Sequence, residues 1–346
     1  MHKAHWKSRA VGFIALAGAL VAADAASAAC ASMRKINIGV SVAPPNVVHT
    51  SPYVAKELGF FEKHCIDATI IQFEGGGSPA AKAAAAQGTA LVSVQPIAVG
   101  RGVKVQQIWG LAPRLPQAYM VGADIKTAKD LKGKKLSAVG GGVGGFNWLM
   151  GRQVLNTAGL KVDDVQFIAG GTAARLPGLL TGQIDGVALH PEDVYLAQQK
   201  NPKLHVLVQL AELLPDYYFN AYGASTEWIA KDRPLMVDAV AAMIEANRAL
   251  YDDKMADKTI PIIMKATGKP KDAVEYSRKV LIDHCVWSVN DGFNAKRTEW
   301  TVDNDIQNGY IKKDQKPTVE RVFNEKLAAD AVKAAGGRIK IGKCTE

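Results

Sequence analysis

From residue 35 onward, short β-branched apolar segments alternate with amphipathic segments of helical period. Residues 35–42 are of the first kind and predict a strand. Residues 51–59 begin with Ser-Pro, place apolar side chains on one helical face and end in glycine, which predicts a short helix. The remaining elements expected in this first set are a strand at 68–73, a helix at 78–88, and strands at 91–94 and 105–111.

A second series of alternating segments begins near residue 127. Its expected strands are 135–139, 165–168, 186–189 and 205–210, and its expected helices are 126–131, 146–158, 172–181 and 191–200. One more strand is expected at 219–224, followed by helices at 234–251, 255–267, 271–283, 295–308 and 324–335. Strand–helix alternation at this spacing predicts an α/β fold with parallel or mixed sheets.

The length of 346 residues suggests about two domains. The first series spans too few residues to form a complete lobe, and the helical C-terminal region can return to pack on it. We therefore expect a discontinuous first lobe of residues 33–119 plus 220–346 and an inserted second lobe of residues 120–219. Two such lobes joined by two crossovers would place their loops on either side of a cleft.

The first 28 residues have the pattern of a secretory signal peptide. Lys3, Lys7 and Arg9 precede an apolar run at 10–23, and an Ala-Ser-Ala cleavage sequence occupies 26–28. A membrane anchor is the alternative, but the run is shorter than the roughly 20 residues that a spanning helix needs. We therefore expect the protein to be exported, with residues 1–28 as its signal peptide.

Charge and cysteine content narrow the function classes. Without the three basic residues and the one acidic residue of the signal, the formal charge falls from +9 to +7. The basic residues are dispersed and no nucleic-acid-binding motif accompanies them. A mild attraction of anionic solutes is therefore expected, and nucleic-acid binding is not.

An exported chain with four cysteines suggests disulfides, with free buried thiols as the alternative. The pairs we favour are Cys30–Cys65 and Cys285–Cys344.

Residues 140–145 have the sequence Gly-Gly-Gly-Val-Gly-Gly, between an expected strand and an expected helix. The loop contains a G-x-G-x-x-G pattern, but five glycines in six residues match many patterns. We favour a cradle of backbone N–H groups at the helix N-terminus, suited to carboxylate, sulfonate, nitrate or phosphate groups, over a dinucleotide site. A turn that only packs is the other alternative. No cofactor is expected, and the scattered histidines predict no metal site.

In open α/β sheets, ligands bind beyond the carboxyl ends of the strands. The candidate ligand-binding residues at such ends are Gln95, Thr172, His49 and His190. Arg175 could clamp an anion through two hydrogen bonds, or form a surface salt bridge. Phe146 could line the cleft or pack inside.

Tyr217 and Tyr218 lie in an aromatic run at the expected crossover between the lobes. One of them could close over a ligand, offering a ring and a hydroxyl group. The alternative is that both only pack at the hinge.

Three segments together resemble a known family. They are SPYVAKELGFFE at 51–62, DLKGKKL at 130–136 and LLTGQIDG at 179–186. Their order and spacing are similar to those of solute-binding proteins of ABC importers of the nitrate/sulfonate/taurine class, which includes binders of thiamine-pyrimidine precursors. The resemblance implies a type II periplasmic binding protein: two α/β lobes, a two-crossover hinge, capture of a small molecule in the periplasm and delivery to a membrane permease. By the same resemblance, the ligand-binding positions are Asn46, His49, Gly77, Ser78, Gly145, Asn147 and His190.

The leading hypothesis is thus a monomeric receptor for a small anionic organic solute, a sulfonate or a carboxylate with an aromatic ring allowed. An exported enzyme on the same fold is the first alternative, and no nucleophile–base pattern supports it. A sensory module that presents its ligand to a membrane receptor is the second, and the sequence does not separate it from transport.

Overall fold

The computed structural model describes residues 1, 30–74, 89–140 and 142–346. The expected signal peptide, the expected helix at 78–88 and two candidate site residues, Gly77 and Ser78, lie outside the described residues. Residues 1–31 and 32–346 form separate units. The description below concerns the second unit.

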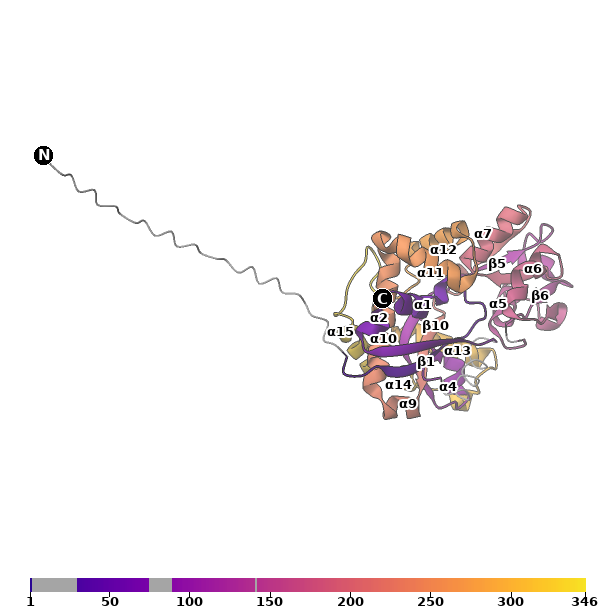
Figure 1. The fold of residues 1–346 in the computed structure, drawn as a ribbon. Coiled ribbons are helices and arrows are strands. Elements are labelled where there is room, and N and C mark those ends of the chain that lie inside the picture. The colour runs from indigo at the N-terminus through magenta and orange to yellow at the C-terminus, as the bar shows by residue number, and fades with distance from the viewer. Residues whose placement is uncertain (2–29, 75–88, 141) are drawn as a thin grey trace. The chain divides into compact units, whose positions relative to one another are not determined.

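Strands β1 (Arg34–Val40) and β2 (Ile66–Gln72) pair in parallel, with Ile36 opposite Ala68 (Figure 1). A second sheet has the order β3-β10-β4, with β3 at Val92–Ser93, β10 at Asn220–Ser225 and β4 at Val105–Ala112. Strand β10 runs antiparallel to both of its neighbours. Residues from before 113 and after 219 therefore share one sheet.

The third sheet contains five strands in the order β7-β6-β8-β5-β9. Its strands are β5 (Ala118–Val121), β6 (Lys135–Ser137), β7 (Gln166–Ile168), β8 (Gly186–Leu189) and β9 (His205–Gln209). The β6 pairings are parallel, whereas β5 is antiparallel to β8 and β9. Strand β5 was not among the expected elements, and it makes this sheet mixed.

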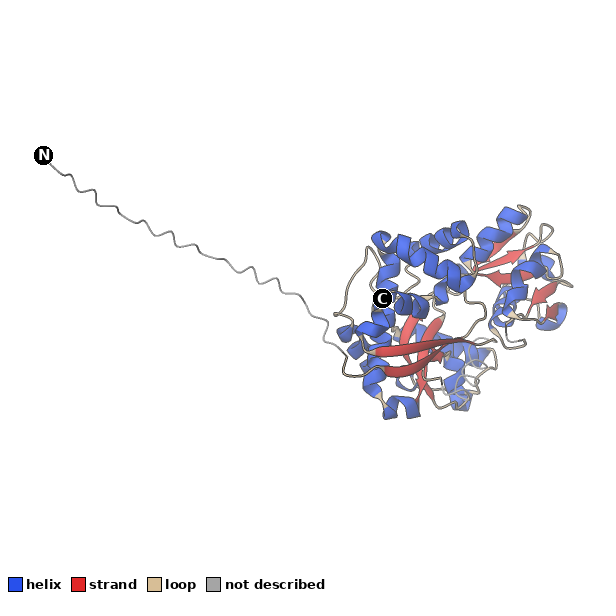
Figure 2. Cartoon of the chain, in the orientation of Figure 1, coloured by secondary structure: helices blue, strands red, loops and turns tan. Residues whose placement is uncertain are grey.

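Helices surround the strands of the three sheets (Figure 2). The α-helices of the first half are α1 (Ser51–Glu57), α2 (Phe60–Lys63), α4 (Pro96–Gly100), α5 (Phe146–Asn156), α6 (Arg175–Leu180), α7 (Pro191–Lys200) and α8 (Leu210–Leu213). Those of the second half are α9 (Thr226–Lys231), α10 (Arg233–Tyr251), α11 (Ala256–Thr267), α12 (Lys271–Asp283), α13 (Ala295–Gln307), α14 (Val319–Val322) and α15 (Glu325–Ala334). Short 3-10 helices are η1 (Val47–His49), η2 (Ala128–Leu131), η3 (Val162–Asp164), η4 (Thr172–Ala174), η5 (Asp253–Met255) and η6 (Lys313–Gln315).

Most expected elements are present with small shifts at their ends, and two differ in kind. The expected helix at 126–131 is the 3-10 helix η2, and the expected helix at 172–181 begins as η4 and continues as α6. The expected lobe boundary at residue 120 falls inside strand β5. The division into 33–119 plus 220–346 and 120–219 otherwise stays a prediction.

Part of the apolar interior of the second lobe forms a cluster of its own. A cluster of buried apolar side chains under the five-stranded sheet draws all of its members from between Ala118 and Leu204, with Val187 and Leu189 of β8 fully buried. A larger cluster extends from β1, β4 and α10 into β5, β6 and α5. Among the described residues, no helix is both long and apolar enough to cross a membrane.

The predicted Cys285–Cys344 disulfide is confirmed, and its Cα atoms are 5.3 Å apart. It joins the end of α12 to the C-terminal segment. Cys30 and Cys65 are also disulfide-bonded, so none of the four cysteines is a free thiol, as the even count predicts.

Candidate functional site

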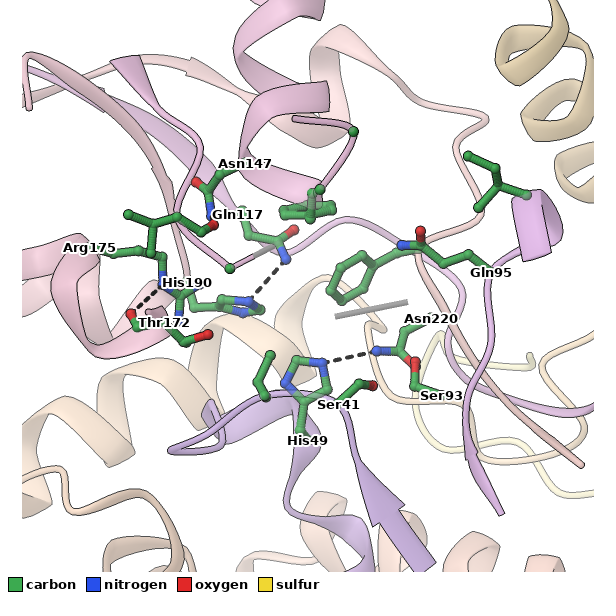
Figure 3. Close-up of a pocket in the computed structure, with 18 of the residues that line it drawn as sticks. Ser41, His49, Ser93, Gln95, Gln117, Asn147, Thr172, Arg175, His190 and Asn220 are labelled. Atoms are coloured by element: carbon green, nitrogen blue, oxygen red, sulfur yellow. Dashed lines mark hydrogen bonds between the residues drawn. The ribbon is translucent and has the colours of Figure 1, made fainter. Parts of the chain in front are cut away.

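A cavity of about 280 Å³ opens where loops that follow strands of the three sheets converge (Figure 3). Its lining follows the carboxyl ends of β1, β3, β6, β7 and β8, which is where the sequence places the candidate loops. The main polar and aromatic lining residues are Ser41, His49, Ser93, Gln95, Arg101, Gln117, Phe146, Asn147, Thr172, Arg175, His190, Phe219, Asn220 and Tyr310. The volume is near the lower end of the roughly 300–1,000 Å³ typical of ligand pockets, so a small molecule is indicated.

His49 lies in η1, just beyond β1, and is 5% exposed. The Asn220 side-chain amide donates to His49 Nε2 at 2.9 Å, and the Ser93 hydroxyl donates to Asn220 Oδ1 at 2.9 Å. Burial lowers the pKa of His49 to about 3, with a smaller contribution from the charge of Arg175. The ring is therefore neutral near pH 7. With Nε2 accepting, its proton is on Nδ1, which has no hydrogen-bond partner.

His190 repeats this arrangement on the second lobe, at the N-cap of α7. The Gln117 side-chain amide donates to His190 Nε2 at 3.1 Å, and His190 Nδ1 has no partner. Burial holds the pKa of His190 well below 6.5, and the positive charge of Arg175 lowers it further. Two neutral imidazoles thus face one another with ring centroids 5.6 Å apart.

Arg175 is the first residue of α6 and is 6% exposed. Its Nε donates to the carbonyl oxygen of Thr172 at 3.1 Å, and its Nη2 donates to Asn46 Oδ1 at 3.0 Å. Both partners are neutral, and no described carboxylate lies within ion-pairing distance of its guanidinium. Burial lowers its pKa, but arginine remains charged in proteins. The charges of Asp193, Glu192 and Glu74 act on the guanidinium from beyond ion-pairing distance. Its hydrogen bonds leave an N–H group available to an anion.

Phe219 occupies the middle of the aromatic wall. Its ring centroid lies 5.5 Å from that of Phe146 and 6.1 Å from those of both His49 and His190. The arrangement offers ring faces and edges to a flat ligand. Tyr310 and Val143 lie at the rim, and Val143 is largely exposed.

The glycine loop before α5 needs its glycines. Gly140, Gly142 and Gly144 have φ of 79°, 65° and 84°, values that other residues rarely adopt. Gly145 is the N-cap of α5 and makes no side-chain capping bond, so the N–H groups of the first helical turn are open. The cradle of N–H groups therefore stays a prediction that this geometry allows.

The hydroxyl and backbone N–H groups of Thr172 already have a hydrogen-bond partner. Glu74 Oε2 accepts from the Thr172 hydroxyl at 2.9 Å and from the Thr172 backbone N–H at 3.3 Å. A carboxylate of the first lobe thus occupies the position at which an anion could bind. Among the polar groups of this region, the side chain of Arg175 is better placed for an external anion.

Asn46 lies behind the cavity rather than in its lining. Its amide donates to Glu192 Oε1 at 2.9 Å while its oxygen accepts from Arg175. Glu192 is fully buried and also accepts from Val47 N at 3.1 Å and Ser277 Oγ at 2.8 Å. Burial raises the pKa of Glu192, and the neighbouring Asp193 adds to that shift. Glu192 and Asp193 thus hold α7 against the first lobe, and Asp193 pairs with Lys269.

The cavity brings together eight of the predicted site residues, namely His49, Gln95, Gly145, Phe146, Asn147, Thr172, Arg175 and His190. That they contact a solute stays a prediction. Asn147 bonds to the main chain at Val139 O and Ala188 N, so its amide supports the wall.

Tyr217 and Tyr218 are buried outside the cavity lining, and the Tyr218 hydroxyl donates to Gly292 O at 2.9 Å. The third residue of that run, Phe219, takes the place expected of a tyrosine. Three further residues line the cavity but were not among the predicted site residues, because no local motif marks them: Gln117, Asn220 and Arg101.

Among the residues the structure describes, no group of three or more His, Cys, Asp or Glu side chains could hold a metal ion. Neither cavity histidine bonds to a serine or cysteine in the described residues. The arrangement is suited to binding by hydrogen bonds, charge and ring contacts.

Comparison with known proteins places the chain. The NMT1/THI5-like family model matches residues 46–255, more than half of the sequence. An alkanesulfonate-binding protein, SsuA from Xanthomonas axonopodis pv. citri bound to MOPS, is 17% identical with a TM-score of 0.66, covering 85% of this chain and 99% of that one. The nitrate-binding protein NrtA from Synechocystis PCC 6803 is 14% identical with a TM-score of 0.68, covering 87% and 89%.

At these identities the structures show a shared fold, and the expected two-lobed fold of periplasmic binding proteins is confirmed. A curated Haemophilus influenzae protein, whose name assigns it to thiamine biosynthesis, is 33% identical over 147 residues. That alignment covers 41% of this chain and 46% of the relative, so the chain spans about half the length of that protein.

Proposed function

Because the chain belongs to the NMT1/THI5-like family, we propose that it is a periplasmic receptor that captures a small anionic organic solute and delivers it to an ABC permease. The solute would bind in the cavity between the lobes. The mature receptor would be monomeric and would begin after the Ala-Ser-Ala sequence at residues 26–28. Structural relatives with the same fold include proteins named for binding sulfonates and nitrate.

One observation carries the choice of an anion: Arg175 is a buried guanidinium in the cavity wall whose hydrogen bonds go only to neutral oxygens. Its Nη1 has no partner among the described residues, so a sulfonate or carboxylate can reach it without displacing a protein group. The open N–H groups at the start of α5 favour the same charge.

The aromatic wall favours an organic solute over a bare inorganic anion. Phe146 and Phe219 would cover the apolar part of the molecule. Binding without chemical turnover is part of the proposal, because the two cavity histidines are held neutral and bonded to amides rather than to a nucleophile.

A ligand panel tests this function. The mature protein is partly unfolded and dialysed to strip co-purified solute, then refolded and melted with alkyl sulfonates, nitrate, aromatic and aliphatic carboxylates, pyrimidines and amino acids. A solute at a thousand times its Kd stabilises by ~4 kcal/mol, a shift of several degrees for a protein of this size.

A shift with one class of acid, and recovery of that acid unchanged by mass spectrometry, would support a receptor. Conversion of the acid would show an enzyme instead. A shift confined to neutral or cationic compounds would overturn the anionic assignment.

A further inference from the structure

Gln117 lies on the crossover between β4 and β5 and is 1% exposed. Its backbone carbonyl accepts from Leu210 N at 3.0 Å, and its side-chain amide donates to His190 Nε2. The main chain and the amide nitrogen are thus both anchored. Figure 3 shows the Gln117 side chain directed toward His190, with a dashed line that marks their hydrogen bond.

The other half of this amide is unpaired. Gln117 Oε1 is buried and has no hydrogen-bond partner in the described residues. Most buried side-chain polar atoms in folded proteins have a hydrogen-bond partner. Gln107 Oε1 is also unpaired, but Gln117 differs from Gln107 in lining the cavity. His49 Nδ1 and His190 Nδ1 are unpaired in the same cavity wall.

The unpaired groups have a definite pattern. The two imidazoles are donors at Nδ1 because their Nε2 atoms accept from amides, and Arg175 adds a charged donor. Among the unpaired buried atoms of the described lining residues, Gln117 Oε1 is the acceptor and the two histidine Nδ1 atoms are donors. A solute that satisfies all of them has acceptor atoms for the histidines and arginine and a donor for Gln117.

Resting on the proposed function, we infer that the solute carries a neutral O–H or N–H donor in addition to its acidic group, and that Gln117 Oε1 selects for that donor. Hydroxy- and amino-substituted acids fit this description, whereas acids without such a group leave the carbonyl oxygen unpaired. A site built to pair with a substrate hydroxyl or amine rejects analogues that lack it, because its buried polar group is then stranded.

Matched pairs of small acids test the inference. We would measure Kd by calorimetry for 3- and 4-hydroxybenzoate and for 3- and 4-methylbenzoate, with the corresponding benzenesulfonates as a second series. Hydroxyl and methyl groups are similar in size, and the methyl group is the more apolar. A preference for the hydroxy compounds therefore cannot come from burial of apolar surface.

In the wild-type protein we expect one or both hydroxy isomers to bind about tenfold or more tightly than the matching methyl compound. In Gln117→Met, which keeps the length of the side chain and removes the amide, the ratio should fall to about one. Gln72→Met is the matched control, because it makes the same substitution at an exposed glutamine outside the cavity lining. The ratio should survive in that variant.

The outcomes separate the two proposals. Acids that bind with no preference for the hydroxy compound in the wild type would overturn the role of Gln117 and leave the receptor for anions intact. A preference that persists in Gln117→Met would also overturn it. If no acid in either series binds, selection of aromatic hydroxy acids by Gln117 is overturned, and the panel of alkyl sulfonates and aliphatic carboxylates decides the proposed function separately. The wild-type ratio decides the matter even if Gln117→Met does not fold.

Discussion

Replacing Arg175 with methionine removes the buried positive charge and keeps most of the side-chain volume. The wild-type guanidinium donates to Thr172 O at 3.1 Å and to Asn46 Oδ1 at 3.0 Å, and both acceptors are neutral. If the charge serves the solute, the variant should lose affinity for acids while the ligand-free fold is little affected. If the charge serves the fold, the reverse should hold.

The expected magnitudes differ enough to be separated. A charge-assisted hydrogen bond is worth about 1.5–3 kcal/mol, and a fully desolvated charge pair about 2–5 kcal/mol. We therefore expect Arg175→Met to weaken binding of an organic acid by roughly 30-fold to 1,000-fold. In the ligand-free protein, two neutral acceptors lose a donor, but burial of an unpaired cation is relieved. The free energy of unfolding should change by less than about 2 kcal/mol.

Calorimetry with the best acid of the panel gives the first number, and urea unfolding of the stripped protein gives the second. Arg101→Met is the matched control. Arg101 also lines the cavity, but it is exposed and its Nε donates to the carbonyl of Tyr310 at 3.0 Å. Its replacement should weaken binding by about threefold at most, because solvent screens its charge. Equal affinity in wild type and Arg175→Met would refute the reasoning.

Three other changes test the frame around the site. Glu192→Leu strands three donors and should lower the free energy of unfolding by about 3 kcal/mol or more, whereas Glu192→Gln should cost about 1 kcal/mol, by urea titration. Asp305 is buried and its pKa is raised to about 7 from 3.8, so stability should fall as pH rises from 4 to 8, by up to about 4 kcal/mol from this group. Asp305→Asn should remove that dependence, and an unchanged slope would contradict it. Replacing Cys285 and Cys344 by alanine opens a link across 59 residues and should lower stability by up to about 4 kcal/mol in chemical unfolding.

Elements whose ends are marked by residues such as proline or glycine could be predicted closely from the sequence. The strand at 186–189 and the helices at 191–200 and 271–283 occur with the expected bounds. Pro191 at the first helical position starts α7, which is why its beginning is readable from the residues alone. Strand β5 escaped prediction because its direction and partners come from β8 and β9, which are distant in the chain.

The site residues also include some that could be predicted from the sequence and some that could not. Arg175, His49 and His190 follow strands and could be found from their position at a carboxyl end. Gln117 and Asn220 could not, because no spacing or residue pattern marks them. They matter only because the fold brings each within 3.1 Å of a histidine Nε2. In the Tyr-Tyr-Phe run, the choice of which ring faces the cavity depends on tertiary contacts, since the Tyr218 hydroxyl bonds to Gly292.

The two crossover segments would link recognition of the proposed solute to closure of the two lobes. Gln117 on the first crossover holds His190, and Phe219 on the second contacts both histidines. Any rotation of one lobe against the other must pass through these segments, so it changes the distance between His49 and His190. A solute that bridged the two imidazoles, as proposed, would therefore bind more tightly in one lobe arrangement than in others. That difference in affinity would be the free energy available to drive closure.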